Sequence, residues 1–144
     1  MEFIAIKTAN GLKPAFDLDY DMYSKLKTGD SFKIKVTKVR NLEFHRKYFA
    51  LINCAWAYQN EATTKHFKEN IELFRKTVEI ASGHCDMIFS IKLKAWVEVP
   101  KSIAFDKMDG YEFQELYERV KDILFSIFLK NISQQEFESN LINF

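Results

Sequence analysis

The sequence predicts an α+β fold, with a small, mostly antiparallel sheet packed against a central helix at about residues 42–57 and a long C-terminal helix at about residues 109–130. Apolar residues recur at helical spacing in the long segments and alternate with polar residues in the short ones. The chain has only 4 Gly and 2 Pro, which argues against a turn-rich all-β protein and against disordered linkers. These observations indicate a compact mixture of helices and strands.

The length and composition predict one domain over residues 1–144. A chain that is 47% hydrophobic and 15% aromatic can build one substantial core at this length. The net charge of +1 does not by itself predict a polyanionic partner. Residues 1–60 nevertheless carry a balance of +4 and residues 61–144 a balance of −3, so the local clustering of charge is more informative than the total.

The first forty residues predict three short elements. A strand is expected over Glu2–Lys7, with Gly11 as its break, and a short helix over Asp17–Leu26, capped by an aspartate and ended by Gly29. Residues 32–37 alternate strictly between apolar and polar side chains. This alternation predicts a half-buried strand with lysines on its outer face.

Two helices are expected next. Asn41 is a good cap for a helix over Leu42–Tyr58 that is apolar on nearly every side. Such a helix usually lies at the centre of a core. A second helix is expected over Thr64–Ala81, where Ser82–Gly83 ends it.

The second half of the chain predicts a strand pair and then helix. Strands are expected over Cys85–Lys92 and Trp96–Phe105, and Pro100 indicates an edge position or a bulge because it cannot donate to a ladder. Asp109 is expected to cap a helix that runs to about Lys130.

The end of that long helix is the sequence's candidate for self-association. Ile123–Leu129 is apolar on more than one side, and an uncovered side favours a homodimer. The alternative is that a short terminal helix covers it within the monomer. Ser133 to Glu136 fits the capping box that would begin such a helix.

The most informative segment is a cluster of basic side chains at a predicted strand-to-helix junction. The strand places two lysines on one face, and the start of the next helix adds further cations and unpaired N–H groups that suit phosphate. The alternative is an ordinary solvated surface. The candidate nucleic-acid-binding residues are Lys33, Lys35, Lys38, Arg40, His45, Arg46 and Lys47.

Single-stranded nucleic acid also needs aromatic side chains on which bases can stack. Tyr48 and Tyr58 are the candidates for this role, although packing in the core is favoured for each.

Three blocks of the chain resemble an uncharacterised family of phage and prophage proteins. The first is KVRNLEFHRKYFALIN at Lys38–Asn53, read as Arg-Asn followed by His-Arg-basic-aromatic-Phe-Ala-Leu. The others are GHCD at Gly83–Asp86 and PKSIAFDKMDGYEFQELY at Pro100–Tyr117, in the family's order. The spacer between the last two is short, as a trimmed hairpin would be. That family has no established activity, so the resemblance implies a phage or prophage context.

The basic junction is also similar to the family of lambda Orf (NinB) recombination mediators. Arg40, Arg46 and Lys47 match its strand-end Arg and its Asn-Arg-Lys turn, while Phe44-His45 stands where that family has Gln-Asn. Both have a Met shortly before an acidic helix, here in Met108–Phe113. This resemblance implies a dimer that binds single-stranded DNA and assists strand annealing or recombinase loading.

Strong catalytic motifs are absent from the sequence, which has no CxxC pair, HExxH, P-loop or GxSxG. We therefore expect no enzyme activity, no metal and no cofactor. His84, Cys85 and Asp86 are adjacent on a strand and point to alternating faces, so His84 is expected to be structural. The alternative enzyme is a divalent-metal nuclease, whose candidate ligands are Asp106, Asp109, Glu112 and Glu115.

Two free cysteines, no secretory signal and no long apolar run predict a protein of the bacterial host's cytoplasm with no membrane contact. The function expected is an accessory role in phage or prophage DNA recombination or replication, with single-stranded DNA as the ligand. A host single-strand-binding or recombination protein is a further candidate partner. The alternative is a protein-interaction module that acts on a host replication or defence protein.

Overall fold

The computed structural model describes residues 1–104 and 107–144. They form two compact units, which we call unit 1 (Met1–Val36) and unit 2 (Thr37–Phe144) and describe separately. The α+β class is confirmed, because the described chain combines helices with two antiparallel two-stranded sheets. The single domain stays a prediction.

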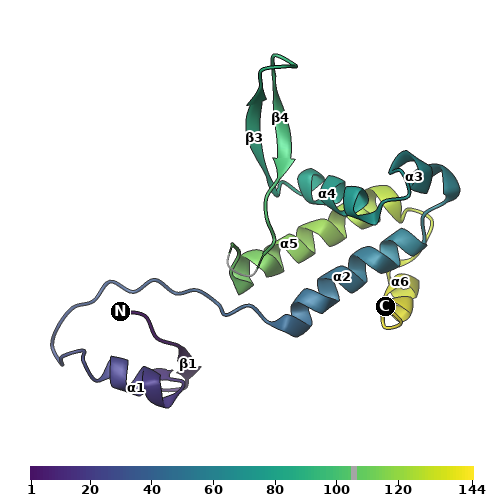
Figure 1. The fold of residues 1–144 in the computed structure, drawn as a ribbon. Helices are drawn as coiled ribbons and strands as arrows, with labels where there is room; N and C mark the ends of the chain where they lie inside the picture. The colour runs from purple at the N-terminus through teal and green to yellow at the C-terminus, as the bar shows by residue number, and fades with distance from the viewer. Residues whose placement is uncertain (105–106) are drawn as a thin grey trace. The chain divides into compact units, whose positions relative to one another are not determined.

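Unit 1 is a hairpin followed by a short helix (Figure 1). One strand was expected here, ending before Gly11. The structure instead has two paired strands, and Gly11, at φ 111°, is the first residue of the second. The Asp19 carboxylate accepts the backbone N–H groups of Ile4 at 2.9 Å and Phe16 at 3.0 Å, so it joins the first strand to the start of the helix. The elements are β1 (Ala5–Thr8), β2 (Gly11–Pro14) and α1 (Asp17–Tyr23).

The strand expected over residues 32–37 was wrong. Residues 31–41, all of them described, contain no strand or helix. The apolar side chains that were expected to be buried are 49% exposed at Phe32, 71% at Ile34 and 65% at Val36. Alternation alone cannot make a strand, because a strand needs a partner for its backbone hydrogen bonds.

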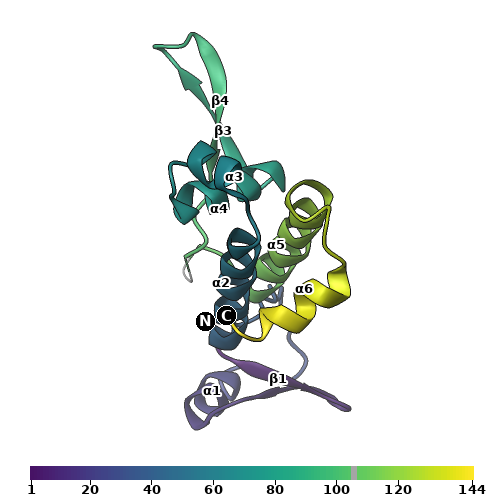
Figure 2. The ribbon, with the colours of Figure 1, turned by 90° about the vertical axis from the view of Figure 1, so that its right-hand side faces the viewer.

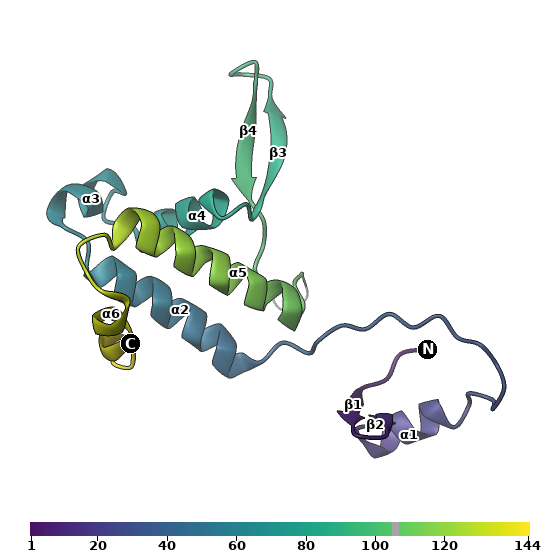
Figure 3. The same cartoon turned by 180° about the vertical axis from the view of Figure 1, so that it is seen from behind.

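Unit 2 contains the core, in which α2 and α5 run side by side with α4 beside them and α6 against α2 (Figure 3). Its helices are α2 (Leu42–Ala57), α3 (Glu61–His66), α4 (Ile71–Ala81), α5 (Gly110–Ile123), the π-helical turn η1 (Leu124–Phe128) and α6 (Gln134–Leu141). The largest fully buried side chains include Tyr48, Leu51, Phe74, Phe113, Leu116, Leu124 and Phe137.

The helix starts follow the sequence closely. Asn41 accepts an N–H of the first turn of α2 at 2.7 Å, and Ser133 accepts the Glu136 N–H at 3.1 Å. Asp109 accepts the Glu112 N–H at 2.9 Å, and Glu112 in turn accepts the Asp109 N–H at 3.3 Å. These three predicted caps are therefore confirmed, whereas the aspartate cap expected for α1 was wrong, because Phe16 is the N-cap residue and Asp19 lies in the first turn.

The helix expected over Thr64–Ala81 is interrupted. Lys68 and Glu69 adopt left-handed backbone angles, with φ 56° and 55°, and Asn70 then caps α4. The ring centroids of Phe67 and Phe74, on either side of the break, lie 5.5 Å apart in the core. The change of direction between α3 and α4 is thus fixed by burial of both rings, which local helical spacing does not predict.

The second hairpin, β3 (Cys85–Ser90) with β4 (Ala95–Pro100), stands away from the helices (Figures 1 and 2). The sequence predicts one sheet packed on the central helix, whereas the described residues form two separate ribbons. Every strand of a two-stranded ribbon is an edge, so Pro100 is at an edge as expected. The predicted strand end at Phe105 lies outside the described residues.

Much of the apolar surface at Ile123–Leu129 is covered inside the chain. The Phe128 ring packs against Phe74 at 5.0 Å, and the Phe125 ring packs against Phe137 of α6 at 5.2 Å. Ile127 is 52% exposed. This agrees with the alternative in which the terminal helix covers the surface, and the homodimer stays a prediction.

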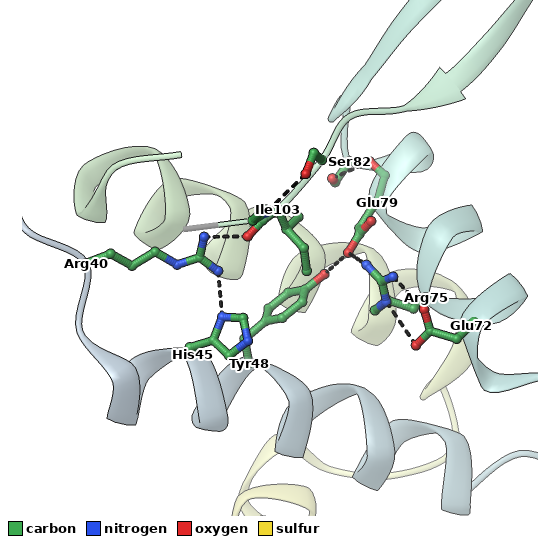
Figure 4. Close-up of polar contacts among 10 residues, drawn as sticks. Arg40, His45, Tyr48, Glu72, Arg75, Glu79, Ser82 and Ile103 are labelled. Atoms are coloured by element: carbon green, nitrogen blue, oxygen red, sulfur yellow. Dashed lines mark hydrogen bonds and ion pairs between the residues drawn. The ribbon is translucent and has the colours of Figure 1, made fainter. Parts of the chain in front are cut away.

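Arg40 ties the segment before α2 to the rest of unit 2 (Figure 4). Its side chain is buried, and its guanidinium donates to the Ile103 carbonyl and, at 2.6 Å, to His45 Nδ1. The guanidinium carbon lies 3.7 Å from the Phe113 ring centroid. One side chain thus holds together the start of α2, the segment after β4 and α5.

A second polar cluster joins α2 to α4 inside the core (Figure 4). The Tyr48 hydroxyl donates to Glu79 Oε1 at 2.6 Å, and Arg75 donates to the same oxygen at 2.7 Å. Burial first, and then the charge and hydrogen bond of Glu79, raise the pKa of the Tyr48 hydroxyl far above its ordinary value of 10.0. The neutral phenol is therefore part of the native core.

Replacing Arg40 should destabilise unit 2. We expect Arg40→Ala to lower the free energy of unfolding by about 2 kcal/mol, since it removes hydrogen bonds and a cation–π contact in a buried setting. Arg40→Lys should recover only part of this, because one ammonium cannot match the planar fork. Urea unfolding measures the change. Arg46→Ala, an exposed control, should stay within about 0.5 kcal/mol, and equal losses for the two variants would contradict the assignment.

Alkaline pH should destabilise the core through Tyr48. Unfolded Tyr48 loses its proton near pH 10.0 and native Tyr48 does not, so the free energy of unfolding falls as pH rises above that value. This group alone adds a slope of up to about 1.4 kcal/mol per pH unit. Urea unfolding at a series of alkaline pH values should show a shallower fall for Tyr48→Phe. The exposed control Tyr20→Phe should keep the wild-type slope, and parallel curves for wild type and Tyr48→Phe would contradict this account.

Candidate nucleic-acid interface

The seven cationic and imidazole side chains singled out from the sequence are divided between the two units. Lys33 and Lys35 are exposed in unit 1. The other five belong to unit 2, where they lie between Lys38 and Lys47 around the start of α2. That Lys33 and Lys35 share their surface stays a prediction.

Arg40 and His45 serve the fold. The Arg40 guanidinium is occupied by the contacts described above, and His45 Nδ1 accepts one of its N–H groups. Burial, and then the positive charge of Arg40, lower the pKa of His45 below its ordinary value of 6.5. His45 is therefore neutral at pH 7. Its role is to accept a hydrogen bond from Arg40 and so hold the guanidinium in place.

Lys38, Arg46 and Lys47 are the exposed cations of this corner. Lys38 Nζ lies 5.5 Å from the Tyr111 ring centroid, and Lys47 Nζ lies 5.3 Å from that of Tyr117. Both rings come from α5. Each ammonium group thus rests on a ring of this helix through a cation–π contact, which keeps its charge accessible to solvent.

Gly110 explains how Lys38 reaches α5. Its N–H donates to the Lys38 carbonyl at 2.7 Å. A Cβ at Gly110 would lie 3.0 Å from that oxygen and 3.1 Å from the Val39 carbonyl oxygen. The absence of a side chain therefore lets the extended segment before α2 lie directly on the first turn of α5.

Tyr111 is the aromatic residue that sequence reasoning missed. It is 55% exposed beside Lys38, whereas Tyr48 is fully buried and Tyr58 is 38% exposed, its hydroxyl bonded to Asn140. The available signal was its position in the first turn of α5, off the apolar stripe that begins at Phe113.

Two features limit the positive potential of this corner. Asn41 accepts the N–H groups of Glu43 and Phe44 in the first turn of α2, so these two are not open to phosphate. Lys47 also faces acids, since Arg46, Lys47, Glu43 and Glu138 line one shallow cleft of about 310 Å³. Side-chain cations and an exposed ring are what remain for a ligand.

A second cleft, of about 570 Å³, lies between the base of β3–β4 and α5. It mixes cations with acids, among them Arg119 and Glu112, and includes the buried His84. Asp109 and Glu112 cap α5, and Asp106 lies outside the described residues. No group of three or more His, Cys, Asp or Glu side chains that could hold a metal ion occurs in residues 1–104 and 107–144.

Comparison with known proteins gives a family. The family described as protein of unknown function (DUF1367) matches residues 1–66 and 59–143. No curated protein and no solved structure matches. Within the part of the chain that the structure describes, no helix is long and apolar enough to cross a membrane. Phage origin and a relationship to the Orf (NinB) mediators stay predictions. By the extent of the match, the chain belongs to the family described as protein of unknown function (DUF1367).

Proposed function

We propose that this protein binds single-stranded nucleic acid through Lys38, Arg46, Lys47 and the exposed ring of Tyr111. The observation that supports this most is the pairing of Lys38 Nζ with the Tyr111 ring, 5.5 Å away, on an exposed surface. A cation for phosphate next to a ring for a base is the minimal unit of sequence-neutral single-strand binding. The ligand we favour is DNA, in an accessory role in phage or prophage recombination or replication.

The arrangement suits a strand better than a duplex. Three cations and one ring are a small footprint, and stacking on Tyr111 requires an unpaired base. The acids on the Lys47 side weaken attraction at long range, so binding depends on close contacts that form after the strand arrives.

Lys33 and Lys35 extend the proposal to unit 1. They alternate with apolar residues in an exposed segment without helix or strand, and such a segment can follow a flexible strand. In our proposal they add two phosphate contacts to the three of unit 2.

Removing the three cations of unit 2 should weaken binding in a salt-dependent way. Each phosphate contact to a single strand contributes about 0.7 to the slope of log affinity against log salt, so the variant Lys38→Gln, Arg46→Gln, Lys47→Gln should lose about 2 from that slope. Between about 50 and about 200 mM salt, the wild type should lose about 20-fold more affinity than the variant. Fluorescence anisotropy with a labelled oligonucleotide measures both.

The matched control removes three exposed lysines elsewhere in unit 2, as Lys65→Gln, Lys76→Gln, Lys130→Gln. It has the same change in net charge and should keep the wild-type slope. Equal slopes for both triple variants would show that only net charge matters and would reject the site. The double variant Lys33→Gln, Lys35→Gln should lose about 1.4 from the slope if unit 1 takes part.

Tyr111 should contribute through stacking. We expect Tyr111→Ala to weaken single-strand binding by about 1–3 kcal/mol with little change in salt slope, while Tyr111→Phe keeps most of the affinity because the ring remains. Anisotropy with single-stranded and duplex oligonucleotides of one sequence measures this. A loss for Tyr111→Phe as large as for Tyr111→Ala, or an equal loss on duplex, would rule out base stacking.

A protein-interaction module remains the second candidate function, and the exposed apolar side chains of β3–β4 support it. Such patches on a protein surface usually mark contacts with another protein. Capture of partners from a bacterial lysate, repeated after nuclease treatment, separates the two candidates. Partners that persist favour the module, and partners that disappear favour nucleic acid.

A further inference from the structure

The β3–β4 hairpin, which we call the arm (residues 85–100), exposes more large apolar side chains than an isolated ribbon can carry without cost. Both strands leave the helices and extend into solvent (Figures 1 and 2). The exposed residues are Met87 52%, Ile88 52%, Phe89 48%, Ile91 86%, Leu93 67% and Trp96 65%.

The register shows how these side chains are divided. Residues directly opposite each other share a face, and the pairs Met87↔Glu98 and Phe89↔Trp96 lie on one face of the ribbon. The Phe89 and Trp96 rings contact each other edge to face at 5.5 Å. We call this the aromatic face. Its two rings remain about half exposed or more, so the arm does not bury them by itself.

An isolated two-stranded ribbon is only marginally stable in water. Its outer edges carry unpaired backbone groups, and a contiguous apolar face on a surface normally marks an interface. The arm is such a ribbon, with open edges and an exposed apolar face within sixteen residues. A partner that covers this face would stabilise it.

Charge along the arm is polarised. The turn carries Lys92 and Lys94, and no acid occurs from Met87 to Val97. At the base, the exposed Glu98 lies on the aromatic face, whereas Asp86 lies on the opposite face, 3.7 Å from Lys101 Nζ. A second arm laid antiparallel to the first would place each cationic turn near Glu98 of the other. Parallel arms would place like charges together.

We propose that two copies of this chain associate through their arms, antiparallel about a two-fold axis, with the aromatic faces packed together. The contact is isologous, because each arm offers the same surface to the other. It lies apart from the cations of α2 and does not rest on nucleic-acid binding. It also differs from the dimer surface at Ile123–Leu129 that the sequence suggests.

The exposed rings supply a large part of the area that an interface needs. A Phe or Trp side chain can bury about 150–250 Å², and a specific interface needs roughly 1,200 Å² in total. Two copies each of Phe89 and Trp96, about half exposed or more, supply several hundred Å². Met87 on the same face, and Ile91 and Leu93 in the turn, add further exposed apolar surface from both arms.

The first test is the mass in solution without nucleic acid. Light scattering and sedimentation equilibrium should give twice 17.0 kDa for the wild type above micromolar concentration. Trp96→Glu should raise the dimer dissociation constant by at least about 30-fold, since it removes a central aromatic contact from both copies. The matched control is Ile127→Glu, which puts a charge on an exposed apolar residue of η1 and should leave the dimer intact.

A charge exchange tests the antiparallel geometry. Lys92→Glu with Lys94→Glu should weaken the dimer by about tenfold, because each turn then faces Glu98 of the other arm. Adding Glu98→Lys should restore it, since the charges at the turn and at the base of the aromatic face are then reversed together. Rescue supports the proposal, and a triple variant as weak as the double variant overturns the antiparallel arrangement.

Three results would overturn the proposal as a whole. One is a monomer at all accessible concentrations. Another is a dimer that Trp96→Glu leaves intact and Ile127→Glu dissociates. The third uses Trp56→Phe, which leaves Trp96 as the single fluorophore: quenching of Trp96 by a single-stranded oligonucleotide in a monomeric protein would assign the arm to nucleic acid. Because the first two results come from protein without oligonucleotide, they leave the proposed function untouched, and failure of the proposed function leaves the dimer test untouched.

Discussion

The contact between Arg40 and the Phe113 ring is the interaction on which the rest of unit 2 depends. A guanidinium 3.7 Å from a buried ring, bonded to the Ile103 carbonyl and to His45, fixes the last residues before α2 against α5. This contact sets where the chain enters α2. It thereby sets where Lys38, two residues earlier, and Lys47, two turns later, come to lie. A residue that sequence reasoning counts as a ligand for phosphate is therefore the one that positions the other cations.

The polar groups of unit 2 are of two kinds, those paired with one another inside the core and those exposed at the surface. Arg75, Glu79 and Tyr48 satisfy one another across α2 and α4, and their charges and hydrogen bonds are used inside the molecule. Burial by itself would lower the pKa of Arg75. The contacts of Arg75 with Glu72 and Glu79 outweigh burial and raise this pKa above its ordinary value. Lys38 and Lys47, in contrast, rest on the faces of aromatic rings at the surface. Cations held in this way stay available, which is why the candidate interface consists of them.

The helical body buries its large apolar side chains, whereas the arm leaves its own exposed. In the body, Phe67, Phe74 and Phe128 pack against one another, so the apolar end of the long helix is mostly covered within the chain. In the arm, the Phe89 and Trp96 rings contact each other and remain about half exposed or more. Self-association is thus better supported at the arm than at the helix end. A cationic patch near α2 and an apolar arm elsewhere on unit 2 would let nucleic-acid binding and dimerisation occur independently.

By itself, the sequence determined the features that depend on local hydrogen bonding. Asn41, Asp109 and Ser133 cap their helices as their side chains dictate, and the α+β class follows from the spacing of apolar residues. Tertiary structure alone decided the fate of groups whose partners are distant in sequence. Residues 32–37 alternate correctly but form no ladder, and Arg40 is buried because Phe113 and Ile103 lie against it. A charged side chain is buried, and a strand forms, only where the fold supplies hydrogen-bonding partners. Those partners are distant in sequence, so the spacing of residues along the chain does not predict them.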